Sequence, residues 1–137
     1  MKSFELTAIG RVESGLTNLA DAPKQADEGA PPAWLVFDPS VVDGLASIRV
    51  GDTLVLVTWL DRARRDVLQV HPRGDTSRPV AGVFSTRSPN RPNPVGLHRV
   101  RVSAVEGARI RVHELEAIDG TPIVDLKAEL SEDPGQR

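Results

Sequence analysis

The sequence consists of short apolar segments separated by glycine, proline and aspartate, and this pattern restricts the chain to a small set of β folds. Residues 53–60 are almost all apolar or β-branched, which is typical of a buried central strand. Residues 97–105 and 109–115 alternate around a Glu106-Gly107 turn, which predicts a hairpin. About seven short strands favour an all-β barrel or sandwich over an alternating α/β fold. The other strands are expected at residues 4–12, 34–37, 67–70, 81–86 and 122–126.

One short helix is expected between the second strand and the central strand. Asp38 is suited to an N-cap, Pro39 to the first helical position and Gly51 to the end of the element. With 137 residues the chain has the length of one domain, which we place at residues 1–130. Residues 131–137 are polar and contain proline and glycine, so we expect a flexible C-terminal tail.

Composition excludes several kinds of chemistry. The chain has no cysteine, so disulfides, zinc-thiolate sites, iron–sulfur clusters and thiol nucleophiles are ruled out. The three histidines, His71, His98 and His113, lie far apart and favour ordinary surface or strand positions over a metal site, so no metal is expected. No apolar run is long enough to cross a membrane, and the N-terminus lacks a secretory signal. We therefore expect a cytoplasmic protein with no membrane partner.

Charge is distributed unevenly along the chain. Residues 62–101 contain nine arginines and two acids, a net charge of +7, and the remainder carries −9. This asymmetry indicates one cationic surface on an otherwise acidic protein. Arginine outnumbers lysine by 14 to 3, which suits bidentate contact with phosphate or carboxylate, although a GC-rich genome gives the same bias.

The most distinctive stretch is residues 82–97, which read GVFSTRSPNRPNPVGL. Three prolines within six residues remove backbone donors, so a helix is excluded and an interior strand is disfavoured. We expect a stiff, extended loop that displays polar side chains in fixed positions, as a site for a small charged ligand requires. The alternative is a proline-rich edge connection with solvated arginines. The displayed residues are Arg87, Ser88, Asn90, Arg91 and Asn93.

Two further features could carry function. The turn Asp119-Gly120-Thr121-Pro122 combines an acceptor, a donor and a glycine that allows close approach to a ligand, although a plain β-turn has the same composition. The predicted hairpin places four arginines on its outer face, which need anions from the fold, from a second subunit or from nucleic acid. Glu114 and Glu116 are nearby acids that could balance this face. The four arginines are Arg99, Arg101, Arg109 and Arg111.

At these motifs the sequence resembles the TrmO (YaeB/TsaA-like) family. Residues 82–97 follow the family pattern G-V-F-A-T-R-S-P-x-R-P-N-P-I-G-L, with Ser85 for Ala and Val95 for Ile. Residues 23–25 correspond to the family P-R-Q, and residues 119–127 to D-G-T-P-x-x-D-I-K. The resemblance covers nearly the whole chain. One departure is Ala128-Glu129, where the family continues with Pro-Tyr.

The resemblance implies a small β-barrel methyltransferase that works as a homodimer with S-adenosylmethionine as cofactor. It implies N6-methylation of threonylcarbamoyladenosine beside the tRNA anticodon. Cofactor-binding positions carry over to three segments of this chain and to the place of a family polar pair, here Leu60-Asp61. They are Pro23, Lys24, Gln25, Asp61, Arg87, Leu97, Asp119, Gly120, Thr121 and Pro122.

The expected chemistry assigns roles to other residues. Asp125 or Asp119 could accept the proton from N6, although Asp125 could equally pair with Lys127. Arg91 and Asn93 could hold a substrate carboxylate or phosphate. Arginines of the cationic segment are expected to contact tRNA phosphates, or else to balance acids such as Asp61 and Asp66. They are Arg62, Arg64, Arg65, Arg73 and Arg78.

Two alternatives stay open. The same cofactor could serve methyl transfer to a small molecule or another RNA, which the changed Pro-Tyr position permits. The chain could instead be a non-catalytic module that binds S-adenosylmethionine or RNA. Transfer to tRNA, binding without transfer to tRNA, and binding without any turnover distinguish the three cases.

Overall fold

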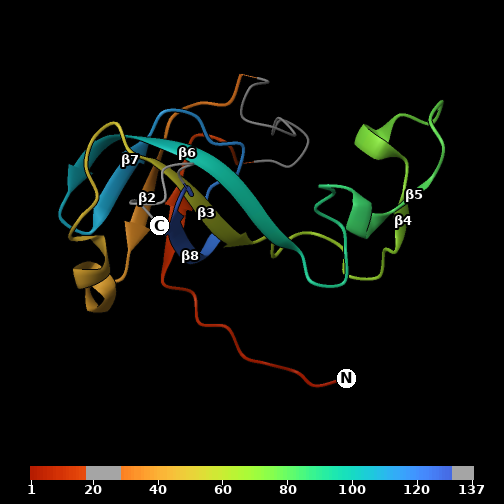
Figure 1. Ribbon diagram of the computed structural model, residues 1–137, viewed down its shortest axis with the longest axis horizontal. Helices are drawn as coiled ribbons and strands as arrows, with labels where there is room; N and C mark the ends of the chain where they lie inside the picture. Colours follow the sequence, from red (N-terminus) through yellow and green to blue (C-terminus); the bar gives the residue numbers. More distant parts are fainter. Residues whose placement is uncertain (18–28, 131–137) are drawn as a thin grey trace.

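The computed structural model describes residues 1–17 and 29–130, and within them six antiparallel strands close into a barrel (Figure 1). The strands follow one another around the barrel in the order β1-β2-β7-β6-β3-β8. This closure confirms the expected all-β barrel. Their bounds are β1 (Gly10–Glu13), β2 (Ala33–Phe37), β3 (Thr53–Trp59), β6 (Val95–Glu106), β7 (Arg109–Val112) and β8 (Pro122–Ala128).

Alternation along the strands fills the barrel with branched apolar side chains. On β6 and β7 the inward positions are fully or almost fully buried, as the hairpin pattern predicted. Gly10 is required where β1 meets β2, because a Cβ there would lie 2.5 Å from the carbonyl oxygen of Val36. The largest fully buried core side chains are Leu35, Leu56, Ile110, Leu115 and Ile123.

The expected helix is present but is shorter than predicted and of the 3-10 type. It is η2 (Pro39–Leu45), and the Asp38 carboxylate accepts a hydrogen bond of 2.9 Å from the backbone N–H of Ser40. The N-cap and the proline position are confirmed. Gly51 lies beyond the helix in the turn before β3, with φ of +94°.

The first strand starts later than the sequence pattern predicted. It begins at Gly10, and Phe4 is exposed on a segment that leads away from the barrel (Figure 1). The mixture of apolar and polar residues over 4–8 therefore does not reflect a buried face, whereas Ile9 packs against the core. None of the helices in the described part of the chain is long and apolar enough to cross a membrane.

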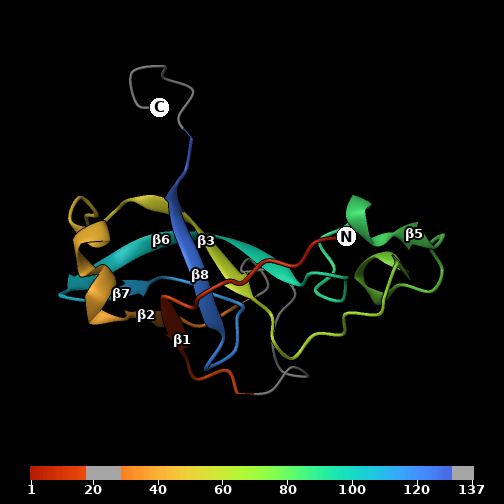
Figure 2. The same ribbon diagram turned by 90° about the horizontal axis from the view of Figure 1, so that it is seen from below.

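Residues 69–85 form an arm that stands away from the barrel (Figures 1 and 2). It contains a two-stranded sheet of β4 (Gln69–Val70) and β5 (Ala81–Gly82), and the 3-10 turns η3 (Pro72–Gly74) and η4 (Val83–Ser85). The strand expected over 81–86 stops at Gly82, because the Thr86 N–H and hydroxyl both donate to the Val83 carbonyl and close a turn. The long strand β6 starts between the arm and the barrel.

Candidate functional site

A large open cleft lies between the arm and the end of the barrel where β6 begins. Its volume is about 2270 Å³, more than the roughly 300–1000 Å³ of an ordinary small-molecule pocket. The cleft therefore has room for a small ligand and for part of a larger one. Nine of the predicted site residues line it, from four different segments: Asp61, Arg62, Arg73, Arg78, Arg87, Arg91, Asn93, Leu97 and Thr121.

The Pro-rich loop, residues 87–94, is held in shape by its own arginine. The Arg91 guanidinium donates to three backbone carbonyls, those of Val83 (3.1 Å), Thr86 (3.2 Å) and Ser88 (2.9 Å). Arg91 is partly buried, so these charge-assisted bonds are poorly screened by water. Arg91 was expected to hold a substrate anion. In the structure its guanidinium instead donates to backbone carbonyls of residues 83–88.

A second arginine fixes the other end of the loop. Arg65 donates to the Pro92 carbonyl (2.8 Å) and to the Asn93 side-chain oxygen (3.1 Å). Its guanidinium also lies 5.2 Å from the ring centroid of Trp59, in cation–π range. Asn90 accepts a 2.9 Å bond from the backbone N–H of Arg64. The loop is therefore preorganised, as expected, by contacts that the sequence pattern did not indicate.

Two predicted cofactor residues meet directly at the start of β6. The Arg87 guanidinium donates to the Leu97 carbonyl (3.2 Å) and remains exposed, as does the Leu97 side chain. A cation with unused donors beside an apolar side chain can bind a ligand that has both a carboxylate and an aromatic or aliphatic part. Thr121, buried on the other side of the cleft, donates its hydroxyl to the Ile118 carbonyl (2.7 Å).

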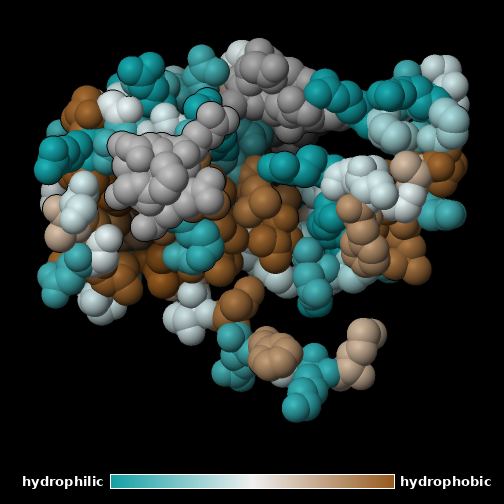
Figure 3. Space-filling model, viewed as in Figure 1, coloured by the Kyte–Doolittle hydropathy of each residue, from teal (hydrophilic) through white to brown (hydrophobic). Residues whose placement is uncertain are grey.

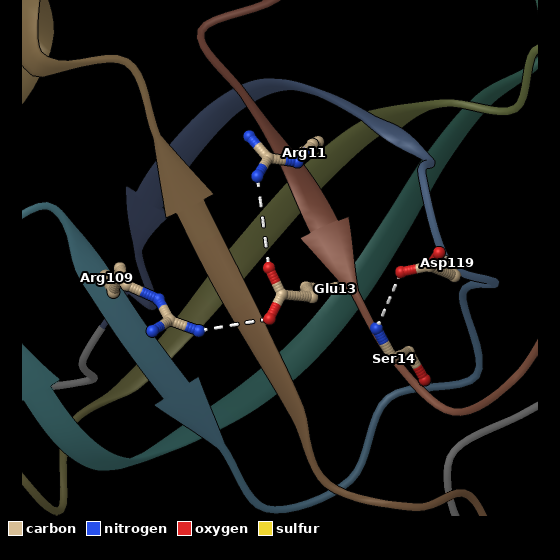
Figure 4. A network of polar contacts seen from close by, with 5 residues as sticks. All are labelled: Arg11, Glu13, Ser14, Arg109 and Asp119. Carbon is tan, nitrogen blue, oxygen red and sulfur yellow. Dashed lines mark hydrogen bonds and ion pairs between the residues drawn. The ribbon is translucent and has the colours of Figure 1, made fainter.

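The rest of the predicted turn joins β1 to β8. The Asp119 carboxylate accepts a 3.0 Å bond from the Ser14 backbone N–H (Figure 4), and Gly120 has φ of +83°. The Gly120 N–H donates to the Val12 carbonyl (2.8 Å). Among the described residues that line the cleft, Thr121 is the one member of this turn. These contacts are those of a structural turn placed next to the cleft.

Two of the four hairpin arginines, Arg99 and Arg109, have acidic partners in the same chain. Glu13 lies between Arg11 and Arg109, at 3.9 and 3.1 Å (Figure 4). The guanidinium of Arg109 also stacks 4.5 Å above the ring of Trp34. Arg99 binds Glu129, with a shortest contact of 2.6 Å that raises the pKa of the arginine by hydrogen bonding. Glu13 and Glu129 balance the face, where Glu114 and Glu116 were expected to do so.

The structure also contains a buried polar chain that sequence reasoning missed. His98 projects into the barrel from β6, where it is 6% exposed, and was expected to be an ordinary histidine. Its Nε2 lies 2.7 Å from the hydroxyl of Thr58, and its Nδ1 is hydrogen-bonded to Oε1 of Glu116. A Cβ on Gly96 would lie 2.5 Å from that hydroxyl and 2.8 Å from Nε2, so this glycine makes room for the pair.

Opposing effects act on the pKa of the Glu116 carboxyl group. Burial raises the pKa of the carboxyl group, but the hydrogen bond and charge of His98, a backbone amide and the charge of Arg87 together outweigh burial. The pKa is therefore below its ordinary value. The Glu116 side chain keeps 17% of its surface exposed and lines the cleft.

The sequence matches the model of a known protein family. The model of the tRNA-methyltransferase O N-terminal domain matches residues 11–132. The chain belongs to the TrmO family. A protein from Archaeoglobus fulgidus, named as an S-adenosyl-L-methionine-binding protein, is 39% identical over 122 residues, which are 89% of this chain and 86% of that protein.

Solved TrmO structures share the fold. A crystal structure of TrmO from Pseudomonas aeruginosa superposes with a TM-score of 0.75 at 23% identity, covering 98% of this chain and 58% of that one. A second gives 0.69 at 22% identity, covering 94% and 57%. This chain thus spans somewhat more than half the length of those TrmO chains, and the resemblance stated from the motifs is confirmed.

Several predicted site residues of this TrmO-family chain lie outside the cleft. Asp125 pairs with Lys127 (3.1 Å), the alternative given above, and lines a separate small cavity. Arg64 pairs with Asp66 (2.9 Å), and hydrogen bonding to the arginine lowers the pKa of Asp66. Arg64 therefore balances an acid, which was the alternative to a phosphate contact. Pro23, Lys24, Gln25 and the predicted tail at 131–137 lie outside the described residues.

No three histidine, aspartate or glutamate side chains in residues 1–17 and 29–130 lie close enough together to hold a metal ion.

Proposed function

We propose that this protein is an S-adenosylmethionine-dependent methyltransferase that modifies N6 of threonylcarbamoyladenosine next to the tRNA anticodon. One observation carries the proposal: a single cleft joins the family cofactor positions Arg87, Leu97 and Thr121 to the cationic arm. The name of the Archaeoglobus relative supports the cofactor. The name of the matching domain supports tRNA as the substrate.

The residues of the cleft fit the cofactor chemically. Arg87 has donors for its carboxylate, the exposed Leu97 side chain offers an apolar surface for its adenine, and the turn at Thr121 is held rigidly. The cofactor supplies an electrophilic methyl group whose departure leaves a neutral thioether, so no acid is needed at the leaving group. The protein then contributes mainly by positioning and by excluding water. A loop fixed by Arg91 and Arg65 is suited to that task.

The arginines of the arm support the proposal of a large anionic substrate. Arg73 and Arg78 lie on it, exposed at the mouth of the cleft. Arg73 has φ of +54°, an uncommon conformation for a residue other than glycine, and such conformations concentrate at functional sites. We assign these two arginines, with Arg62, to phosphate contacts, because all three line the cleft. Arg64 and Arg65 are not among the described residues that line it.

Replacing Arg87 by alanine is expected to weaken cofactor binding. The loss of a charge-assisted hydrogen bond, about 1.5–3 kcal/mol, corresponds to roughly a 10- to 150-fold rise in Kd. Isothermal titration calorimetry with S-adenosylmethionine measures it. Arg111→Ala, which removes the same charge from the outer face of β7, is the matched control and should bind like the unaltered protein. Equal Kd values for both variants would show that Arg87 does not contact the cofactor.

We also propose a homodimer, on evidence different from the one that the sequence suggested. Arg99 and Arg109 of the hairpin have acids in their own chain, so these two do not call for a second subunit. The arm and the residue before it, however, expose Leu68 (64%), Val80 (50%) and Phe84 (77%), and hydrophobic residues are visible on the arm in Figure 3. Light scattering should give twice the mass of one chain, and Phe84→Glu should give a single-chain mass. A single-chain mass for the unaltered protein would refute the dimer.

The methyl acceptor is tested by tritium transfer from labelled S-adenosylmethionine to total tRNA. We expect label in tRNA from cells that make threonylcarbamoyladenosine and none in tRNA from cells that cannot. Label in both would indicate another RNA position. Cofactor binding without label in either RNA would favour a small-molecule acceptor, and no turnover on any acceptor would favour a binding module.

A further inference from the structure

The chain of hydrogen bonds from Thr58 through His98 to Glu116 runs from the interior of the barrel to the wall of the cleft. Thr58 is completely buried, His98 almost completely, and Glu116 reaches the cleft. The cofactor assignments above do not use these three residues. A buried polar chain costs stability unless every member is satisfied, and each of these side chains has a partner.

The geometry gives both ring nitrogens of His98 a partner. Nε2 lies 2.7 Å from the hydroxyl of Thr58, and Nδ1 donates to the carboxylate of Glu116. The two contacts fix the imidazole ring, and the ring in turn orients the carboxylate.

The arrangement has the order of a hydroxyl–histidine–carboxylate triad, but it faces the opposite way. In a hydrolase the hydroxyl meets the substrate and the carboxylate is buried. Here the Thr58 hydroxyl is inaccessible and the carboxylate reaches the cleft. Glu116 is thus the end of the chain that can contact a ligand.

The two acids proposed from the sequence as proton acceptors are occupied elsewhere. Asp119 accepts the backbone N–H of Ser14, and Asp125 pairs with Lys127 beside a different cavity. Neither belongs to the described residues that line the cleft. Glu116 is a cleft-lining acid that is also largely buried and held in one orientation by a second side chain.

We propose that Glu116, positioned by His98, accepts the proton that the acceptor nitrogen loses when it is methylated; this inference rests on the proposed function. The nitrogen–carbon bond forms as the carbon–sulfur bond breaks, and the electron pair of that bond stays on sulfur. The N–H proton moves to the carboxylate of Glu116, which becomes a neutral carboxyl group. Solvent takes the proton when the open cleft releases the product.

The charges that face Glu116 suit this role. They are His98 on β6 and Arg87 at the start of the Pro-rich loop, and both favour the carboxylate over the carboxyl form. The carboxylate is the form of Glu116 that can take up the proton. Burial raises the pKa of Glu116, and the hydrogen bond and charge of His98 counter that effect. Without His98 the pKa of Glu116 would therefore rise.

Glu116→Gln tests the proton acceptor, because the amide has the same shape and cannot accept a proton. With tRNA as the acceptor, kcat is expected to fall by about 10²- to 10⁴-fold, the usual contribution of a general base. The Kd for S-adenosylmethionine, measured by calorimetry, should stay the same. Glu116→Asp should recover part of kcat. Glu106→Gln removes the same charge from the exposed β6–β7 turn and should behave like the unaltered protein.

His98 is tested as a positioning residue by the pH profile of kcat. In His98→Leu the acidic limb of the profile should move to higher pH, so activity near pH 6 falls more than activity near pH 8. His98→Gln, whose amide can still donate to the carboxylate, should move it less. A residue needed only for packing would lower activity equally at all pH values.

If the unaltered protein does not methylate tRNA, both the proposed function and the role of Glu116 as proton acceptor are wrong. If it does, the inference is overturned when Glu116→Gln keeps its kcat, or when the variant loses cofactor affinity and kcat to the same extent. If His98→Leu does not fold, the two Glu116 variants still decide the question.

Discussion

Replacing Arg91 by alanine is expected to abolish most cofactor binding while leaving the barrel intact. The change removes the donors of three carbonyls in residues 83–88, none of which belongs to a barrel strand. Each charge-assisted bond is worth about 1.5–3 kcal/mol and three are lost, so a rise in Kd of roughly 150-fold or more is expected. Calorimetry with S-adenosylmethionine measures the binding, and thermal unfolding shows whether the barrel remains.

Arg91→Lys keeps the positive charge at residue 91 but changes the shape of the cationic group. A lysine ammonium is a compact point charge and cannot reach the three carbonyls as the planar guanidinium does. It should therefore recover little of the affinity. If Arg91 instead binds a ligand anion, as the sequence suggested, lysine should recover much of it, and the loop-holding role would be wrong.

Replacing Arg73 and Arg78 together by glutamine is expected to flatten the salt dependence of tRNA binding. Each phosphate contact with single-stranded RNA contributes about −0.7 to the log–log slope. Three contacts, from Arg62, Arg73 and Arg78, predict a slope near −2.1, or about a 20-fold loss of affinity between 50 and 200 mM salt. The double variant should keep a slope near −0.7, roughly a threefold loss over the same range.

Glutamine is chosen because alanine would also shorten the side chain at the strained position of Arg73. The KM for tRNA should rise and the Kd for S-adenosylmethionine should not change. The double change Arg49→Gln and Arg111→Gln removes two charges from positions outside the cleft and is the control. An equal slope for all three proteins would show that the arm does not contact RNA, and a slope near zero would favour a small-molecule acceptor.

The barrel could be predicted because its signals are local. Alternation placed Val100 and Val102 inward, and the Glu106-Gly107 turn fixed the hairpin. The same parity also places His98 inward, since it lies two residues before Val100, and Thr58 shares the parity of Leu56. The burial of that pair was therefore readable from the sequence, although its partner Glu116 lies in an irregular segment without a period.

The contacts that hold the site could not be predicted from the pattern. Composition showed that residues 87–94 are stiff and rich in arginine, but not whether a guanidinium faces a ligand or its own backbone. That choice depends on three-dimensional distances, as the contacts of Arg91 and Arg65 show. The position of Asp125 outside the cleft could not be predicted for the same reason. On β8 this residue lies beside a different cavity.

We expect S-adenosylmethionine to bind in the cleft between the arm and the barrel. Amide chemical shifts, followed residue by residue by NMR during titration with S-adenosylmethionine, test this binding site most directly. The large shifts should fall in residues 86–97 and 114–122, and EDTA should leave them unchanged. Shifts confined to the small cavity formed by Ile9, Phe37 and Val41 would contradict it, as would no shifts at saturating S-adenosylmethionine.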